Sequence, residues 1–123
     1  MLVPKNLHYT ENHLWLRKIG LYDFCIGITD FAQKEIGEIH LIEFIRQEIT
    51  VKKGDSWGVV YGINKTFQLI APCDCKIMEV NQNVAIKASL INTDPYNCWF
   101  FILSTNISTD EFLTYNDYIK ITK

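Results

Sequence analysis

The sequence predicts a mostly β domain, a flattened barrel or sandwich of short strands, on three observations. Apolar and polar residues alternate with a period of two in several short runs, as in half-buried strands. Turn-forming residues separate these runs. Helical spacing is limited to a short segment after Thr29, a single turn at 87–92 and the C-terminal end. Because 123 residues suffice for one core and are too few for two, we expect residues 1–123 to form a single domain.

The composition is that of a folded chain with little net charge. Hydrophobic residues make up 48% and charged residues 21%, as in globular proteins rather than disordered ones. A formal net charge of −2, without any run of basic residues, argues against binding to nucleic acid or to a membrane surface. We expect a monomer.

The N-terminus, MLVPKNLHYT, has neither an apolar signal core nor an arginine-rich transit pattern. No apolar run reaches the roughly 18 residues that a membrane span needs. These features predict a cytoplasmic protein, or one of the mitochondrial matrix if the source is eukaryotic and a presequence has been removed.

Two strands open the chain. Leu14, Leu16 and Ile19 outline the first, and residues 23–28 form the second. His13 and Arg17 are the polar positions of the first strand.

A short helix should follow the second strand. It can begin at Thr29 or Asp30, with Asp30 as its cap and Gln33 reaching back, and Gly37 ends it about two turns later. Its expected apolar face comprises Phe31, Ala32, Lys34, Glu35 and Ile36.

The next strand covers residues 40–45, with Glu38 and Glu43 pointing outward. No nucleophile or carboxylate constellation surrounds His40, which favours a surface or partly buried strand histidine over a catalytic base. A loop at residues 46–50 and a solvated turn at residues 52–55 should follow; the lysines of this turn could also meet an acidic partner.

The stretch from Trp57 to Pro72 predicts a hairpin. Trp57, Val59, Tyr61 and Ile63 alternate before a polar break, and Phe67, Leu69 and Ala71 alternate after it. Asn64 and Lys65 should lie at the exposed tip. The Lys65 amine is either a solvated charge or an attachment point for a prosthetic group.

Strand and helix patterns continue to the C-terminus. We expect a strand at 75–80, a loop at 81–85, and one helical turn at 87–92 that ends before Asp94-Pro95. The apolar run 99–103 predicts a strand buried on both faces. Ser108 with Glu111 forms a capping box for a last helix, and its expected apolar residues are Phe112, Leu113, Tyr115, Tyr118 and Ile119.

Four cysteines are present: Cys25, Cys73, Cys75 and Cys98. Without a secretory signal, free structural or incidental thiols are favoured over disulfides. Cys73 and Cys75 would share a face of a strand, so a redox or metal pair stays open as an alternative. Such a pair would need both thiols exposed near the tip and a cation or helix end close by. Their spacing is not that of a common metal site, and the three histidines lie far off in sequence.

The segment WGVVYGINKTFQLIAPCDCKIMEVNQ resembles the lipoyl-bearing segment of the glycine cleavage system H proteins. The resemblance extends from about Tyr9 to Tyr118 through HYTENHLWLR, FCIGITDFAQKEIGEIHLIEF, VKKGDSWGVV and LINTDPYNCWFFIL, with one missing residue between Tyr96 and Trp99. It implies a lipoyl-domain-like hybrid barrel-sandwich with a short helix after Thr29 and a C-terminal helix.

The attachment position departs from that resemblance. Counted without gaps from both sides, Asn64 stands where the family has its lipoyl-lysine, and Lys65 is one residue late. Tyr61 replaces a usual glutamate, and Gly62 stands where a serine is frequent. Asn64 has no amine to acylate, and in a strand or tight turn a one-residue slip turns Lys65 to another direction.

The resemblance implies a role in glycine catabolism. An H protein carries lipoate on a lysine, accepts an aminomethyl group from a pyridoxal-phosphate glycine decarboxylase and passes it to an aminomethyltransferase, after which dihydrolipoyl dehydrogenase reoxidises the dithiol. The carrier supplies reach and shielding rather than chemistry. In this chain only Lys65 could carry lipoate.

Three hypotheses follow. The first in rank is a divergent H-like protein with a degenerate lipoyl site, acting by contact with lipoate ligase or another lipoate- or glycine-cleavage-related enzyme. The second is a working lipoyl carrier through Lys65. The third is a redox or metal role for Cys73 and Cys75. None makes the chain an enzyme, and no catalytic residue or resident metal is expected.

Overall fold

The computed structural model describes residues 1–44 and 50–122. Six antiparallel strands form one sheet in the order β1-β2-β3-β9-β8-β5. Its strands are β1 (His8–Tyr9), β2 (Leu14–Lys18), β3 (Asp23–Ile28), β9 (Phe101–Ser104), β8 (Cys75–Val80) and β5 (Thr50–Val51). A smaller sheet has the order β4-β6-β7, with β4 (Ile39–Glu43), β6 (Ser56–Gly62) and β7 (Thr66–Ile70). The chain is therefore mostly β, as predicted.

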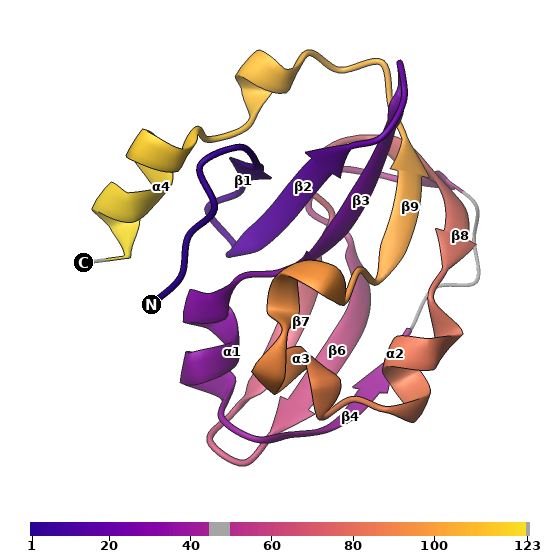
Figure 1. The fold of residues 1–123 in the computed structure, drawn as a ribbon. Helices are drawn as coiled ribbons and strands as arrows, with labels where there is room; N and C mark the ends of the chain where they lie inside the picture. The colour runs from indigo at the N-terminus through magenta and orange to yellow at the C-terminus, as the bar shows by residue number, and fades with distance from the viewer. Residues whose placement is uncertain (45–49, 123) are drawn as a thin grey trace.

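Short helices connect and cover the sheets (Figure 1). They are α1 (Asp30–Ile36), α2 (Gln82–Ile86), α3 (Leu90–Thr93) and α4 (Tyr115–Ile121), with 3-10 turns η1 (Pro95–Asn97) and η2 (Thr109–Glu111). In the described part of the chain, no helix is both long and apolar enough to cross a membrane.

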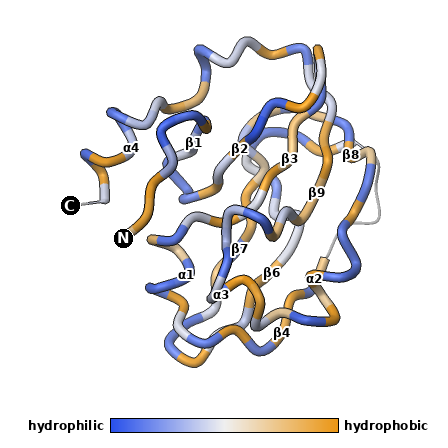
Figure 2. The backbone as a smooth tube through the Cα atoms, in the orientation of Figure 1, coloured by the Kyte–Doolittle hydropathy of each residue, from blue (hydrophilic) through white to orange (hydrophobic). Residues whose placement is uncertain are grey.

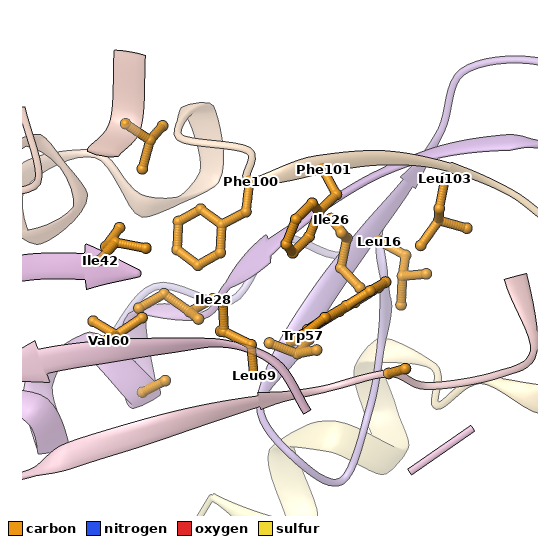
Figure 3. Close-up of a cluster of buried hydrophobic side chains, with 14 of the residues drawn as sticks. Leu16, Ile26, Ile28, Ile42, Trp57, Val60, Leu69, Phe100, Phe101 and Leu103 are labelled. Atoms are coloured by element: carbon orange, nitrogen blue, oxygen red, sulfur yellow. The ribbon is translucent and has the colours of Figure 1, made fainter. Parts of the chain in front are cut away.

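The main core lies between the two sheets and is centred on Trp57. Its ring packs against Phe101 with centroids 4.6 Å apart, and Figure 3 shows Leu16, Ile26 and Leu69 around it. The hydrophobic colours along β3 and β9 in Figure 2 follow this interior. Burial of these side chains at roughly 1.5–3 kcal/mol each supplies most of the favourable free energy of folding.

A second cluster covers the other face of the first strands. Tyr9 and Tyr118 stack with centroids 4.5 Å apart, and Trp15, fully buried, donates from Nε1 to the Pro95 carbonyl. β2 is therefore buried on both faces, which the alternation of Leu14 and Leu16 did not predict.

The predicted strands at 23–28 and 75–80 are confirmed as β3 and β8. The predicted hairpin is confirmed as β6 and β7. β6 is buried from Trp57 to Val60, whereas Tyr61 is half-buried and Ile63 is 66% exposed, so the alternation of this strand does not separate core from solvent positions.

The helix after Thr29 is confirmed, but its cap is Thr29 rather than Asp30. The Thr29 hydroxyl accepts from Ala32 N–H, and Asp30 is the first helical residue, where its carboxylate accepts from Gln33 Nε2 at 2.7 Å. The expected apolar face was wrong for Lys34 and Glu35, which are exposed. Gln33 is buried, and its Oε1 accepts a hydrogen bond from the Asn92 side chain.

Three further predictions were wrong in part. Residues 81–85 fall on the Asn81 cap and α2 rather than in a loop, because the Asn81 side chain accepts from Asn83 N–H. Ser108 caps only the η2 turn, and Thr114 caps the last helix. Ile19 lies beyond β2, and β9 begins at Phe101 rather than at residue 99.

The middle of the chain has one unexpected element and one confirmed turn. Thr50 begins the short strand β5, whereas residues 45–49 of the predicted strand end and loop lie outside the described residues. The turn at 52–55 is confirmed, since Asp55 N–H donates to the Lys52 carbonyl. His40 is exposed on β4, as predicted for a surface histidine.

Candidate functional site

The tip of the β6–β7 hairpin is a tight, exposed turn. Gly62 N–H donates to the Lys65 carbonyl at 3.1 Å, which leaves Ile63 and Asn64 between them. Asn64 and Lys65 are exposed, as predicted. Asn64 does not adopt the left-handed conformation that its residue type tolerates, because its φ is not positive.

The tip is fastened to the end of α1 by backbone hydrogen bonds. Ile63 N–H donates to the Glu38 carbonyl and Asn64 N–H to the Ile36 carbonyl, both at 2.9 Å. The two segments meet at the lower left of Figure 1, where the hairpin loop passes beneath α1. The Asn64 backbone is therefore fixed relative to the rest of the fold.

Gly37 makes this contact possible at the helix end. Its φ of 79° lies in the region that favours glycine, and its N–H donates to the Gln33 carbonyl to close the helix. A Cβ at Gly37 would come within 2.7 Å of Asn64 Nδ2. The Asn64 carboxamide therefore lies directly against the helix terminus.

Gly62 fixes the register of the hairpin. A Cβ at this position would lie 2.2 Å from Ile36 Cγ2 and 2.5 Å from the Ile36 carbonyl oxygen. Sliding the chain by one residue, so that Lys65 took the place of Asn64, would put Ile63 into this space. The slip is sterically excluded with the hairpin in its present position on α1.

Asn92 braces the segment on which the tip rests. Its side chain accepts from Ile39 N–H at 2.8 Å and donates to the Gly37 carbonyl at 2.9 Å and to Gln33 Oε1 at 2.8 Å. One side chain from α3 thus holds α1, Gly37 and the start of β4 together. The sequence prediction missed this role, because a single asparagine in a short helix carries no local signal of a distant partner.

The Lys65 side chain leaves the tip toward α1. Its Nζ lies 4.0 Å from Glu35 Oε1, and both side chains are about half exposed. An ion pair of this separation and exposure contributes little to stability. The amine is therefore reachable from solvent and only weakly held.

His13 lies close enough to Glu35 and Lys65 to be affected by their charges. Its φ of 63° is in the left-handed region, its Nδ1 lies 2.9 Å from the Tyr118 hydroxyl, and its ring packs 4.6 Å from that of Phe31. Burial lowers the pKa of His13 below 6.5; Glu35 opposes this and Lys65 reinforces it. His13 is a neutral structural histidine at neutral pH.

An exposed apolar edge borders the tip. Leu41 on β4 pairs with Tyr61 on β6, so the two side chains share the outer face of the small sheet, and Ile63 follows at the turn. The Tyr61 hydroxyl donates to the Glu43 carboxylate, which raises the pKa of Tyr61. The position that the resemblance gives to a glutamate therefore carries an aromatic side chain here.

Cys73 and Cys75 lie away from this site. Both are buried, and they stand at the far end of β7 from the tip. A redox or metal role was expected to require two exposed thiols near the tip, and this requirement is not met. Among the described residues, no group of three or more His, Cys, Asp or Glu side chains is placed to hold a metal ion.

Comparison with known proteins decides the family. The family model for the glycine cleavage H-protein matches residues 7–123. The chain belongs to this family. Members carry lipoate on a lysine and act as carrier proteins rather than as enzymes.

Individual relatives agree with this family over nearly the whole chain. A glycine cleavage system H protein of Carboxydothermus hydrogenoformans is 39% identical over 98% of this chain and 94% of its own length. One of Listeria welshimeri is 35% identical over 98% of both chains. The crystal structure of a glycine cleavage system H protein from Mycobacterium marinum superposes with a TM-score of 0.84 at 27% identity, covering 96% of this chain and 97% of that one. The lipoyl-domain-like fold expected from the resemblance is confirmed.

Proposed function

We propose that this chain is a divergent H-like protein whose lipoyl site is degenerate, and that it acts by contact with enzymes of glycine cleavage or lipoate metabolism. The observation that carries the proposal is Asn64, fixed at the tip by its bond to the Ile36 carbonyl in a register that Gly62 locks. A carboxamide has no nucleophilic amine and cannot form the amide to lipoic acid. The lipoyl group therefore does not fit this position.

The hairpin nevertheless keeps a backbone that an enzyme can recognise. The tip has the same three backbone anchors, at Gly62, Ile63 and Asn64, whatever its side chains carry. The edge formed by the exposed Leu41 and Ile63 and the half-buried Tyr61 adds apolar contact area beside it. Aromatic and aliphatic side chains at an exposed rim are typical anchors of protein interfaces. A glycine decarboxylase or a lipoate ligase would meet this face when it approaches the tip.

A second candidate function is a lipoyl carrier acting through Lys65. The observation in its favour is the half-exposed amine, held only by the 4.0 Å contact with Glu35. Against it stands the direction of the side chain, which leaves the tip one residue late in a locked register. Modifying enzymes position their targets to within about an ångström, so a displaced amine is a poor acceptor. Dihydrolipoyl dehydrogenase and the aminomethyltransferase would be partners only of this second function.

The decisive measurement is the intact mass of the protein purified from its own host, with peptide mapping across residues 58–76. We expect an unmodified mass while the other lipoyl proteins of the host carry their group. A lipoyl group on Lys65 would overturn the proposal and establish the carrier function.

Variants test the same point with a purified lipoate ligase. Asn64→Lys combined with Lys65→Ala puts the only tip amine at the family position and should be lipoylated, whereas the wild type and Lys65→Ala should not be. Lys53→Ala, which removes an amine from another exposed turn, is the matched control in the Asn64→Lys background and should leave its modification unchanged.

Binding tests the contact part of the proposal. Titration calorimetry of the unmodified wild type with purified glycine decarboxylase and with purified lipoate ligase should give saturable binding to at least one of them. Ile63→Asp should weaken that binding without changing the fold. Absence of binding to both enzymes would reject contact as the function.

A further inference from the structure

The Asp30 side chain is a buried carboxylate at the start of α1. Its Oδ1 accepts a hydrogen bond from Gln33 Nε2 at 2.7 Å, and its Oδ2 accepts from Leu2 N–H at 2.9 Å. The Lys34 ammonium lies 3.3 Å from Oδ2. Burial alone would raise the pKa of Asp30, but these three contacts lower it below its ordinary value. Asp30 is therefore ionised at neutral pH and can only accept hydrogen bonds.

The N-terminal segment and η1 hold Asp30 in place. The Tyr96 hydroxyl accepts from Asp30 N–H at 3.1 Å and donates to the Leu2 carbonyl at 2.7 Å. Leu2 is thus bound at its N–H by Asp30 and at its carbonyl by Tyr96. The Tyr96 side chain is itself buried. These contacts fix the carboxylate through residues that lie outside the hairpin.

An acceptor-only group at Asp30 determines which way the Gln33 carboxamide points. Gln33 is buried, and it must turn Nε2 toward the carboxylate because two oxygens that face each other would repel. Its Oε1 then faces α3, which lies beside α1 in Figure 1, and accepts from Asn92 Nδ2 at 2.8 Å. The direction of the first hydrogen bond is thereby passed on to Asn92.

The contacts on the far side of Asn92 require the same direction. Its Nδ2 also donates to the Gly37 carbonyl at 2.9 Å, and its Oδ1 accepts from Ile39 N–H at 2.8 Å. A reversed carboxamide would put its oxygen against the Gly37 carbonyl and its NH2 group against Ile39 N–H. In the described part of the chain, every buried side-chain N or O atom has a hydrogen-bond partner. Donors and acceptors therefore match at each step from Asp30 to Ile39.

The segment that Asn92 holds also receives the hairpin tip. On either side of Gly37, the Ile36 and Glu38 carbonyls accept the two backbone hydrogen bonds that fasten the tip. The Gly37 carbonyl between them is the one that Asn92 binds. A change in the orientation of the Asn92 carboxamide therefore moves or loosens the acceptors of the tip.

We propose that Asp30 is a positioning residue for the hairpin tip, acting through the carboxamides of Gln33 and Asn92. Its carboxylate sets the direction of both side-chain hydrogen bonds, and that direction keeps the acceptors of the tip in place. An enzyme that recognises the tip meets a fixed backbone because of a carboxylate at the opposite end of α1. The position of the tip does not depend on which enzyme binds there, so only the enzymatic test below rests on the proposed function.

Two single variants and their combination test the direction of the hydrogen bonds. Asp30→Asn turns an NH2 group toward Gln33, because its oxygen accepts from the N-terminal segment, and Gln33→Glu places two carboxylates against each other. Hydrogen exchange of the Ile63 and Asn64 amides should be about tenfold faster in each single variant, with the amides of β3 unchanged. In the double variant the amide at position 30 donates to the carboxylate at position 33, which accepts from Asn92, so exchange should return to the wild-type rate. Unchanged exchange in both single variants, or no recovery in the double variant, would overturn the proposal.

A charge control and a measurement on the wild type complete the exchange test. Lys34→Met removes the ion pair of the same carboxylate but keeps the order of donors and acceptors, so exchange at the tip should stay within about twofold of wild type. In the wild type, the two Asn92 side-chain amide protons should exchange about tenfold more slowly than those of the exposed Asn97. Equal rates would reject the proposal without depending on whether any variant folds.

Lipoate ligase gives the functional readout. In the Asn64→Lys, Lys65→Ala background, Asp30→Asn should lower kcat/KM by about tenfold, because a displaced reacting group costs up to about 10²-fold per ångström. Adding Gln33→Glu should restore kcat/KM, whereas a general loss of stability would not follow the order of the hydrogen bonds. Unchanged kcat/KM in Asp30→Asn would overturn the positioning role. A background that is not modified at all would reject the proposed function, and the exchange rates would still decide the role of Asp30.

Discussion

The two ends of β7 are held in place by different kinds of contact. At the tip, the Asn64 carboxamide lies against the end of α1, and backbone hydrogen bonds fix the turn. At the far end, Cys73 and Cys75 are both buried, with Asp74 between them. The tip is exposed and held by backbone hydrogen bonds, whereas the thiol end is buried and held by side chains.

This difference shows that backbone approach limits sequence change at the tip, whereas side-chain packing limits it at the far end. The tip depends on the close approach of Gly62 and Gly37 to other groups, so its backbone tolerates few changes while its exposed side chains are free to vary. The thiol end is packed, so its side chains must fit the core, and their chemistry changes with their neighbours.

Gly62→Ala should destabilise the protein by disturbing the contact between the hairpin tip and α1. Its Cβ would lie 2.2 Å from Ile36 Cγ2 and 2.5 Å from the Ile36 carbonyl oxygen, and overpacking of this kind costs about 3 kcal/mol. Urea unfolding measures the loss in the free energy of unfolding. Gly20→Ala, whose nearest contact would be Asp23 Oδ2 at 3.4 Å, is the matched control and should change stability little. Equal stability of both variants would show that the tip is not locked on α1.

Asn92→Ala should loosen the support beneath the tip. It removes three hydrogen bonds and leaves Ile39 N–H and the Gly37 carbonyl without this partner, at a cost of about 2 kcal/mol. The free energy of unfolding in urea gives the value. Asn97→Ala, which removes only an exposed contact with Asp94, should stay close to wild type. If the two variants match, Asn92 does not brace the helix end.

His13→Asn should flatten the pH dependence of stability between pH 7 and about 5.5. Burial lowers the pKa of His13 below 6.5, so the unfolded chain binds more protons, and wild-type stability falls as the pH drops through 6.5 toward the lower folded pKa. Asparagine tolerates the φ of 63°. Thermal unfolding across this range measures the slope. His40→Asn, on an exposed position of β4, should keep the wild-type slope, and a steep slope in His13→Asn would contradict the assignment.

Glu35→Gln should have the smallest effect, below about 0.5 kcal/mol, because the contact with Lys65 is long and half exposed. A double-mutant cycle with Lys65→Met in urea isolates the pair. A coupling free energy well above this value would mean that Lys65 is firmly held at α1, which would weaken the carrier alternative further.

Much of the fold was predictable because it follows from local patterns. The alternation around Trp57, the polar break at Asn64 and Lys65, and the stop at Gly37 each act within a few residues. Failures came where a partner distant in sequence decided the outcome. Gln33 was expected to reach back to a cap, but its burial also depends on Asn92, 59 residues away. Trp15 was not expected inside, because the cluster that covers it includes Tyr96 and Tyr118.

The sequence by itself determined the β-rich class, the hairpin and the identity of its tip residues, Asn64 and Lys65, since composition, periodicity and identity at a position are properties of the chain alone. Only the tertiary structure decided that the register cannot slip and that the Cys73 thiol lies within hydrogen-bond reach of Thr105 Oγ1. Both depend on contacts between residues far apart in sequence, Gly62 with Ile36 and Cys73 with Thr105. Such contacts form only when the packed core fixes their distances.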